Sequence, residues 1–185
     1  YSRSKRDQEK LVLASGLDCP VLRPTLMFGW FDRKHFGWLS RFMKRVPVFP
    51  IPGRGNYRRQ PLYVGDFCDI ILSCVKNRRA AGLYNISGQE HFDYVEMIRE
   101  IRKVTGANSM ILHIPYHLFH VLLRVWSWFD RDPPFTTQQL EALVADDEFE
   151  VIDWPNIFGV RSTPFREAID ETFNNPSYSQ VVLEF

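Results

Sequence analysis

DCPVLRPTLMFG, residues 18–29, is an apolar run that Pro24 interrupts near its middle. The run predicts a buried strand that continues into a loop at Pro24, because proline has no N–H group to donate to a neighbouring strand. Residues 1–15, just before it, have the pattern of a helix, and Gly16 is placed to end that helix. A helix followed by a buried strand is typical of an α/β protein.

The alternation of helix and strand continues beyond this first pair. We expect a helix at 34–46, a loop rich in proline and glycine at 46–57, a short strand at 62–64, a helix that Asp66 caps, and a strand at 82–87. Capping residues mark the starts of three more helices: Asp93 with Glu96 ahead of a helix that Gly106 ends, Thr136 with Gln139, and Thr163 before Pro164.

The stretch PYHLFHVLLRVWSWFD, residues 115–130, predicts a helix that needs cover on most sides. Its polar residues recur at intervals of three, four and three and leave a wide apolar remainder: His117, His120, Arg124 and Ser127. We expect this helix to pack within the domain, and a partner or a membrane surface is the less favoured alternative. Polar residues interrupt the run too often for a span of the bilayer.

Composition indicates one globular unit, because 185 residues of which 45% are hydrophobic and 15% aromatic can bury a sizeable core. Cys19, Cys68 and Cys74 are odd in number and form no CxxC pair, so neither a disulfide framework nor a thiolate zinc site is predicted. His117 and His120 have no carboxylate placed to complete a metal site, and no metal is expected. A reducing compartment, the cytoplasm, is the default expectation.

Charge is distributed unevenly along the chain. Residues 30–60 contain eight basic residues against Asp32 alone, a net formal charge of +7, whereas residues 130–185 carry a net charge of −9. The basic stretch could attract an anion such as a phosphate, and a solvated charged face is the alternative. The acidic C-terminal part argues against generic nucleic-acid binding.

The first five residues, YSRSK, place Tyr1 and Lys5 four positions apart and hence on one face of a helix. A cation beside a phenol favours the phenolate and lowers the pKa of the tyrosine, so such a tyrosine could act as a general acid and base. The alternative is a chance pair on a helix surface.

Four motifs in this order resemble those of one family. YSRSK (1–5) resembles the YxxxK catalytic element of the short-chain dehydrogenase/reductases. VLRPTLMFG (21–29) is similar to the RPxxxYG segment of their extended members, the nucleoside-diphosphate-sugar epimerases and dehydratases. GRGNYRRQPLYVGDF (53–67) is similar to their GxGxxxRxxxxVxD stretch, and LYNISG (83–88) to the strand that follows. The resemblance covers residues 1–105, and the remainder looks more loosely like the atypical branch that includes a complex I accessory subunit.

The resemblance implies roles for individual residues. Tyr1 would be the acid/base at a sugar hydroxyl or keto oxygen, and Lys5 would tune Tyr1 and hold the nicotinamide ribose of NAD or NADP. Pro24 and Thr25 would lie near the nicotinamide. Arg59 would grip the diphosphate of the substrate, because a guanidinium presents a fork of donors.

Arg54 and Asp66 complete the substrate site that the resemblance implies. Each assignment has a structural alternative, in which Pro24 only stops a strand, Arg59 pairs with Asp66 or another acid, and the glycines on either side of Arg54 only form a tight turn. The sequence also departs from the pattern at Phe28, where tyrosine is usual, and at Gly65, where an acid often stands.

No glycine-rich βαβ fingerprint occurs in the chain, although that turn holds the cofactor pyrophosphate in this family. We therefore expect the C-terminal part of a Rossmann-like doubly wound sheet plus a small, mostly helical substrate-binding domain. Residues 1–30 and 60–90 would belong to the NAD(P)-binding domain, and 31–59 and 91–185 to the substrate lobe, with the dinucleotide-binding half missing. Residues 1–185 alone are expected to bind NAD(P) weakly and not to turn over.

Two functions of different class follow. The first is the substrate-binding half of an NAD(P)-dependent nucleotide-sugar epimerase or dehydratase, whose partner is a nucleotide-linked small molecule. The second is a non-catalytic structural or interaction subunit. A homodimer stays open, and membrane association is not favoured.

Overall fold

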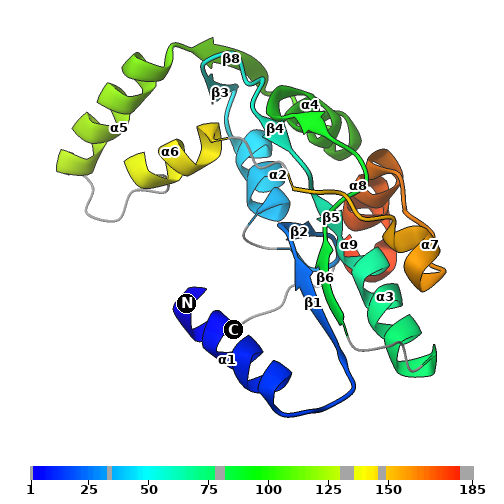
Figure 1. Cartoon of the computed structure of the whole chain (residues 1–185). Coiled ribbons are helices and arrows are strands. Elements are labelled where there is room, and N and C mark those ends of the chain that lie inside the picture. Colours follow the sequence, from blue (N-terminus) through cyan, green and yellow to red (C-terminus); the bar gives the residue numbers. More distant parts are fainter. Residues whose placement is uncertain (1, 33–34, 78–81, 130–135, 146–148, 180–185) are drawn as a thin grey trace.

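The computed structural model describes residues 2–32, 35–77, 82–129, 136–145 and 149–179 (Figure 1). The chain begins with helix α1 (Ser2–Ala14), and Gly16 follows it with a φ of 71°. Strand β1 (Pro20–Pro24) comes next and pairs in parallel with β6 (Gly82–Ile86). The predicted helix, glycine and strand are confirmed over residues 2–24.

Parallel pairing recurs in the rest of the chain, which is the arrangement expected when helices separate the strands. Strand β2 (Met27–Phe28) pairs with β5 (Leu62–Tyr63), and β3 (Val48–Pro52) pairs with β8 (Met110–Ile114). A short antiparallel pair joins β4 (Arg58–Arg59) to β7 (Phe92–Asp93). The described strands therefore hydrogen-bond as four separate pairs.

Strand β3 lies inside the stretch 46–57 that the sequence predicts to be a loop, so that prediction is wrong at residues 48–52. Pro50 and Pro52 carry no N–H, which disfavours a central strand but permits one at an edge. Among the described strands, β3 pairs with β8 alone. One side of β3 therefore has no hydrogen-bonded strand beside it, and prolines are tolerated where the missing N–H would point to that side.

Two apolar clusters hold these elements together. The larger lies among α2 (Phe36–Arg45), α4 (Tyr94–Thr105) and α8 (Phe165–Asn174) and includes Phe28, which fills the position where the family pattern has tyrosine. Phe28 is buried against the rings of Phe36, Tyr63 and Phe165. A phenol hydroxyl in this contact would need a polar partner, whereas phenylalanine packs without one.

The smaller cluster packs α7 (Trp154–Phe158) against α3 (Val64–Asn77) and β6. Trp154 is fully buried there and donates its indole N–H to the carbonyl oxygen of Ser87, 2.8 Å away. Figure 1 shows α7 and α8 beside α3, although about ninety residues separate them in the sequence. The C-terminal segment thus closes back onto the middle of the chain.

Local capping is partly as predicted. The capping boxes of Asp93 with Glu96 and of Thr136 with Gln139 are confirmed, and they begin α4 and α6 (Thr137–Val144). The caps predicted for Asp66 and Thr163 are wrong, because α3 already begins at Val64, and Thr163 instead donates both its N–H and its hydroxyl to the carboxylate of Asp66.

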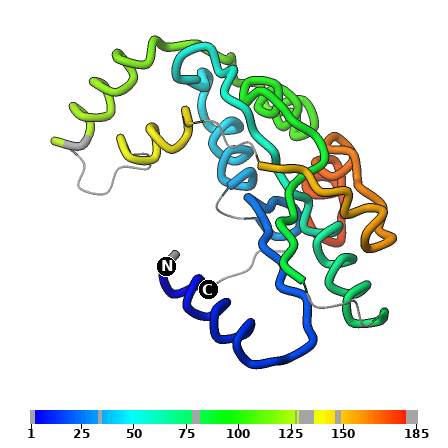
Figure 2. The backbone as a smooth tube through the Cα atoms, in the orientation of Figure 1, coloured from blue at the N-terminus to red at the C-terminus, as the bar shows by residue number. Residues whose placement is uncertain are grey.

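Helix α5 (Tyr116–Phe129) forms where the sequence predicts it, but the expectation that it packs within the domain is wrong for the described residues. Most of its aliphatic and tryptophan side chains are exposed. In Figure 2 the helix leaves β8 and lies at the periphery, with α6 as its helical neighbour. The last described element is α9 (Pro176–Ser179). No helix within the described ranges is long and apolar enough to cross a membrane.

Candidate functional site

The carboxyl end of β1 brings two separate motifs into contact. Pro24 is the last residue of β1, and the N–H of Thr25 donates to the carbonyl oxygen of Ile86 in β6 (3.0 Å). The hydroxyl of Thr25 donates to the carbonyl oxygen of Gln60 (3.4 Å). Ligands of open α/β sheets bind outside the carboxyl ends of the parallel strands, so this edge is the natural place for a site.

Gln60 organises the next part of this edge, and no motif singles it out in the sequence. Its side-chain amide donates to the hydroxyl of Ser87 (3.1 Å) and to the carbonyl oxygen of Gly88 (2.7 Å), while its amide oxygen accepts the N–H of Phe149 (3.0 Å). The backbones are close here, because a Cβ at Gly88 would lie 2.1 Å from the carbonyl oxygen of Pro61. Gln60 therefore fixes the loop after β6 against the segment that carries Arg59.

Arg59, the predicted diphosphate ligand, is buried in this structure. Its Nη1 donates to the carbonyl oxygens of Arg58 and Ala145 (2.7 Å each), and its Nη2 donates to that of Leu143. The guanidinium also lies over the ring of Tyr57, 5.2 Å from its centre. Its cation thus faces the carbonyl end of α6, where the helix dipole is negative. Binding of a diphosphate by Arg59 stays a prediction, and it would need the end of α6 to move.

Arg54, by contrast, is exposed, in the turn between β3 and β4. Gly53 and Gly55 on either side of it have φ values of 63° and 71°, so they form a tight turn. Gly53 donates its N–H to the carbonyl oxygen of Ile114 (2.7 Å), which ties the turn to the end of β8. An exposed arginine on a fixed turn is accessible to an anion, and this role for Arg54 stays a prediction.

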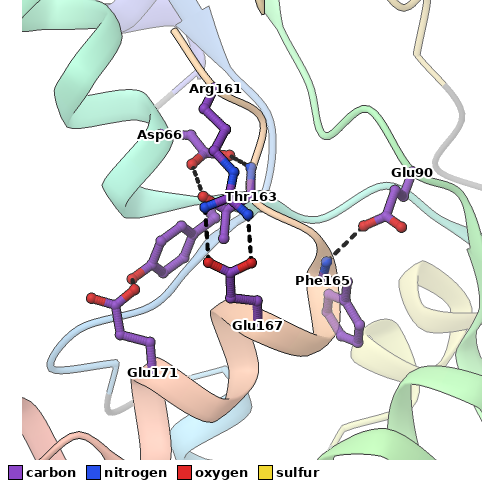
Figure 3. Close-up of polar contacts among 8 residues, drawn as sticks. Asp66, Glu90, Arg161, Thr163, Phe165, Glu167 and Glu171 are labelled. Atoms are coloured by element: carbon purple, nitrogen blue, oxygen red, sulfur yellow. Dashed lines mark hydrogen bonds and ion pairs between the residues drawn. The ribbon is translucent and has the colours of Figure 1, made fainter.

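Asp66, the third predicted substrate ligand, belongs to a polar cluster that Figure 3 shows between α3 and the start of α8. Its carboxylate accepts the N–H of Thr163 (2.9 Å) and the hydroxyl of the same residue. Burial raises the pKa of Asp66 above its usual value, although the bonds from Thr163 oppose that rise. The neighbouring cavity has a volume of about 20 Å³, which accommodates one water and no sugar.

The remaining bonds of Figure 3 also hold the fold together. Tyr63 donates its hydroxyl to Glu171 (2.7 Å) (Figure 3). The second oxygen of this carboxylate accepts the indole N–H of Trp30 (3.3 Å), which the figure does not draw. Glu90 accepts the first N–H of α8, from Phe165 (2.6 Å). Burial and the bond to Glu171 raise the pKa of the Tyr63 phenol. Tyr63 is therefore a neutral donor at neutral pH and not an acid/base candidate.

The predicted catalytic pair falls partly outside the described residues. Tyr1 is not among them, and Lys5 lies on the exposed surface of α1. Arg23, in β1, pairs with Glu9 of α1 and so ties this helix to the strand that ends at Pro24. Within the described ranges no group of three or more metal-ligating side chains gathers.

Comparison with known proteins gives relatives that extend beyond this chain. It is 30% identical over 130 residues to a dTDP-glucose 4,6-dehydratase of Streptomyces niveus. This match covers 62% of this chain and 36% of the relative. It is 24% identical to a UDP-glucose 4-epimerase of Vibrio cholerae, over 64% of this chain and 39% of the relative. No protein family profile matches the sequence.

A third relative is mitochondrial NADH dehydrogenase [ubiquinone] 1 alpha subcomplex subunit 9 of Dictyostelium discoideum. It is 30% identical over 149 residues, which is 76% of this chain and 40% of that subunit. The chain thus spans about two fifths of the length of these curated relatives.

Solved structures share the fold. A UDP-glucose 4-epimerase of Thermotoga maritima with UDP-glucose superposes with a TM-score of 0.62 at 16% identity, over 92% of this chain and 50% of the epimerase. A dTDP-4-dehydrorhamnose reductase of Bacillus anthracis in complex with NADP gives 0.63 at 15% identity, over 95% of this chain and 55% of the reductase. The Rossmann-like α/β class predicted from the sequence is confirmed.

Proposed function

We propose, from the premise that the homologues and structural neighbours of this chain are NAD-dependent epimerase/dehydratase family members, that it forms the substrate side of a nucleotide-sugar epimerase or dehydratase. The observation that carries the proposal is the contact of Thr25 with Gln60 at the carboxyl end of β1. This contact places the predicted nicotinamide neighbours, Pro24 and Thr25, next to the segment of Arg59.

The residues at this edge fit a nicotinamide cofactor. Pro24 is exposed and Thr25 is half-buried, so both can be reached from solvent, and α1 carries Lys5 on its exposed surface. When bound, NAD or NADP supplies a hydride acceptor or donor. Lys5 would hold the nicotinamide ribose and, four residues from Tyr1, lower the pKa of the phenol. Tyr1 would then move a proton at the sugar hydroxyl or keto oxygen.

The substrate diphosphate would meet the basic side of the site. Arg54 is already exposed on its turn, whereas the guanidinium of Arg59 becomes accessible only when the carbonyl end of α6 moves away. Two arginines suit a diphosphate, because guanidinium forks bind phosphate oxygens in pairs. Asp66 takes no direct part in this proposal, since Thr163 occupies its carboxylate.

A test of this proposal measures turnover of the full-length protein with NAD and with UDP-glucose or dTDP-glucose, by chromatography of the nucleotide-sugar products. Tyr1→Phe removes the proton donor and should lower turnover by a factor on the order of 100 or more. The matched control is Tyr178→Phe, in an aromatic ring that stacks on Trp30 and lies outside the proposed site. Equal turnover of Tyr1→Phe and the unmodified protein would rule out the acid/base role.

The match to NADH dehydrogenase subunit 9 favours a second function, that of a non-catalytic subunit built on the same fold. Such a protein would join a larger assembly without turning over a sugar. One purified sample of the protein can distinguish the two functions. An assembled complex on a native gel with no sugar product favours the subunit, whereas product formation by the isolated protein favours the enzyme. A cytoplasmic location belongs to the enzyme proposal.

A further inference from the structure

Helix α1 carries Lys5, but its side chains bury little surface against the described part of the chain. Every residue of α1 whose burial is described is exposed, except Glu9, and Leu11 and Leu13 are 72% and 57% exposed. Only 19% of the Glu9 side chain is exposed. Apolar packing among the described residues therefore does not set the position of α1 against the strands, and Glu9 marks the place where the helix is held.

Arg23 of β1 holds Glu9 at two points. Its Nε donates to one carboxylate oxygen of Glu9 (2.8 Å), and its Nη2 donates to the other. The bond from Arg23 lowers the pKa of Glu9, so this carboxylate is ionised at neutral pH. A surface ion pair usually stabilises little, but a guanidinium that binds both oxygens fixes the orientation of the carboxylate as well as its distance. The pair therefore sets the position of one turn of α1 against β1.

The dimensions of a helix and a strand relate this bond to the proposed site. The turn at residues 15–19 reverses the chain, so that α1 and β1 run in opposite directions (Figure 1). Lys5 lies one helical turn before Glu9 on the same side of the helix, about 6 Å farther from the turn. Thr25 lies two residues after Arg23, about 7 Å farther along the strand direction. The bond between Glu9 and Arg23 therefore brings Lys5 level with Thr25, at the carboxyl end of β1.

We propose that Arg23 and Glu9 are positioning residues for the reaction: their two-point bond keeps the helix that carries Lys5 level with the predicted nicotinamide neighbours. This inference rests on the proposed function and adds to it the contact that sets its geometry. Because Lys5 and Tyr1 are only four residues apart in the chain, loss of the bond leaves their spacing, and hence the pH dependence of turnover, unchanged. It changes the distance from Lys5 to the nicotinamide ribose and from Tyr1 to the substrate.

The test uses variants of the full-length protein with NAD and with UDP-glucose or dTDP-glucose. Glu9→Gln removes the charge and one of the two accepting oxygens, and it should lower kcat about tenfold and weaken NAD binding, measured by calorimetry, about fivefold. The KM for the nucleotide sugar should change by less than about twofold, because Arg54 and Arg59 do not lie on α1. The exchanged pair Glu9→Arg/Arg23→Glu re-forms the two-point bond and should restore kcat and NAD binding to within about threefold.

The matched control is Glu167→Gln, which breaks the two-point pair of Glu167 with Arg161 near the start of α8. It removes the same charge from another exposed pair and should leave kcat and NAD binding unchanged. Arg23→Lys keeps the charge of the arginine without its fork, so it should behave as Glu9→Gln does. Circular dichroism checks that each variant is folded.

The possible results separate the positioning role from the proposed function. The positioning role is overturned if Glu9→Gln and Arg23→Lys keep the kcat and NAD affinity of the unmodified protein, or if Glu167→Gln loses as much. It is also overturned if the pH–rate profile of Glu9→Gln shifts, since Glu9 would then act on ionisation and not on position. If the unmodified protein binds NAD but forms no product, the proposed function fails, while a loss of NAD affinity confined to Glu9→Gln and Arg23→Lys still supports the position of Lys5. Absence of both product and NAD binding overturns the two together.

Discussion

The segment 149–179 and helix α5 are both rich in apolar and aromatic side chains, yet the first packs most of them against the rest of the chain and the second leaves most of them exposed. The first segment also makes polar bonds to the middle of the chain beside these apolar contacts. Trp154, Thr163 and Glu171 each bond to a residue of the middle of the chain, at Ser87, Asp66 and Tyr63. In the segment 149–179, buried apolar side chains and polar bonds to the middle of the chain therefore occur together.

The largest expected effect comes from truncating one tryptophan in each region. Trp154→Ala removes a fully buried ring and leaves the carbonyl oxygen of Ser87 without its indole donor, so the free energy of unfolding should fall by about 3–5 kcal/mol. Trp128→Ala removes an exposed ring and should change it by less than about 0.5 kcal/mol. Guanidinium unfolding measures both, and equal losses would contradict the contrast between the regions.

A smaller effect follows from Asp66, the carboxylate that anchors the start of α8. Asp66→Ala leaves the N–H and the hydroxyl of Thr163 without their acceptor, and we expect a loss of about 1–3 kcal/mol in urea unfolding. The exposed Asp7→Ala in α1 is the control and should change little. A loss no larger than that of Asp7→Ala would show that the position of Thr163 at the start of α8 does not depend on this carboxylate.

The same carboxylate predicts a pH dependence. Burial raises the pKa of Asp66 in the folded state, so the folded protein holds this proton more tightly than the unfolded chain does. Its contribution to stability is therefore complete below the unfolded pKa of about 4 and is lost as the pH rises through the raised pKa. Asp66→Asn should remove this decline, and Asp7→Asn should keep it. Parallel stability profiles for Asp66→Asn and the unmodified protein would contradict the assignment.

The smallest expected effect on the free energy of unfolding comes from removing the hydroxyl of either of two buried tyrosines. Tyr63→Phe removes the bond to Glu171 and should lower the free energy of unfolding by about 1–2 kcal/mol. Tyr57→Phe should be neutral or slightly stabilising, because the Tyr57 hydroxyl is buried without a hydrogen-bond partner in the described part of the chain. Thermal unfolding of the pair checks this order, and a larger loss for Tyr57→Phe would reverse the interpretation.

Short-range signals in the sequence predict most of the fold. The capping boxes at Asp93 and Thr136 act within three residues, and both are found in the structure. The resemblance to the short-chain dehydrogenase/reductases, carried by four motifs in order, is borne out by the relatives. The periodicity of residues 115–130 predicts a helix but does not identify what covers it.

Contacts between distant residues were beyond prediction from the sequence. Asp66 and Thr163 are 97 residues apart, and no local pattern distinguishes a carboxylate that caps its own helix from one that binds a remote threonine. Arg59 likewise bonds to the backbone carbonyl oxygens of residues 143 and 145. Every residue type has such an oxygen, so the sequence at these positions does not mark them as partners of an arginine. The assignments of Tyr1, Lys5, Pro24, Thr25, Arg54, Arg59 and Asp66 to cofactor and substrate stay predictions, as does the division into domains.

The central claim is that the carboxyl end of β1 and the segment of Arg59 form one ligand site. Hydrogen–deuterium exchange of the full-length protein, with and without NAD and UDP-glucose or dTDP-glucose, tests this claim directly. We predict that ligand slows exchange at the amide of Thr25 and at residues 58–60 together, and changes it at the end of α6, where Leu143 and Ala145 hold Arg59. Protection that appears elsewhere and leaves both segments unchanged would contradict the account.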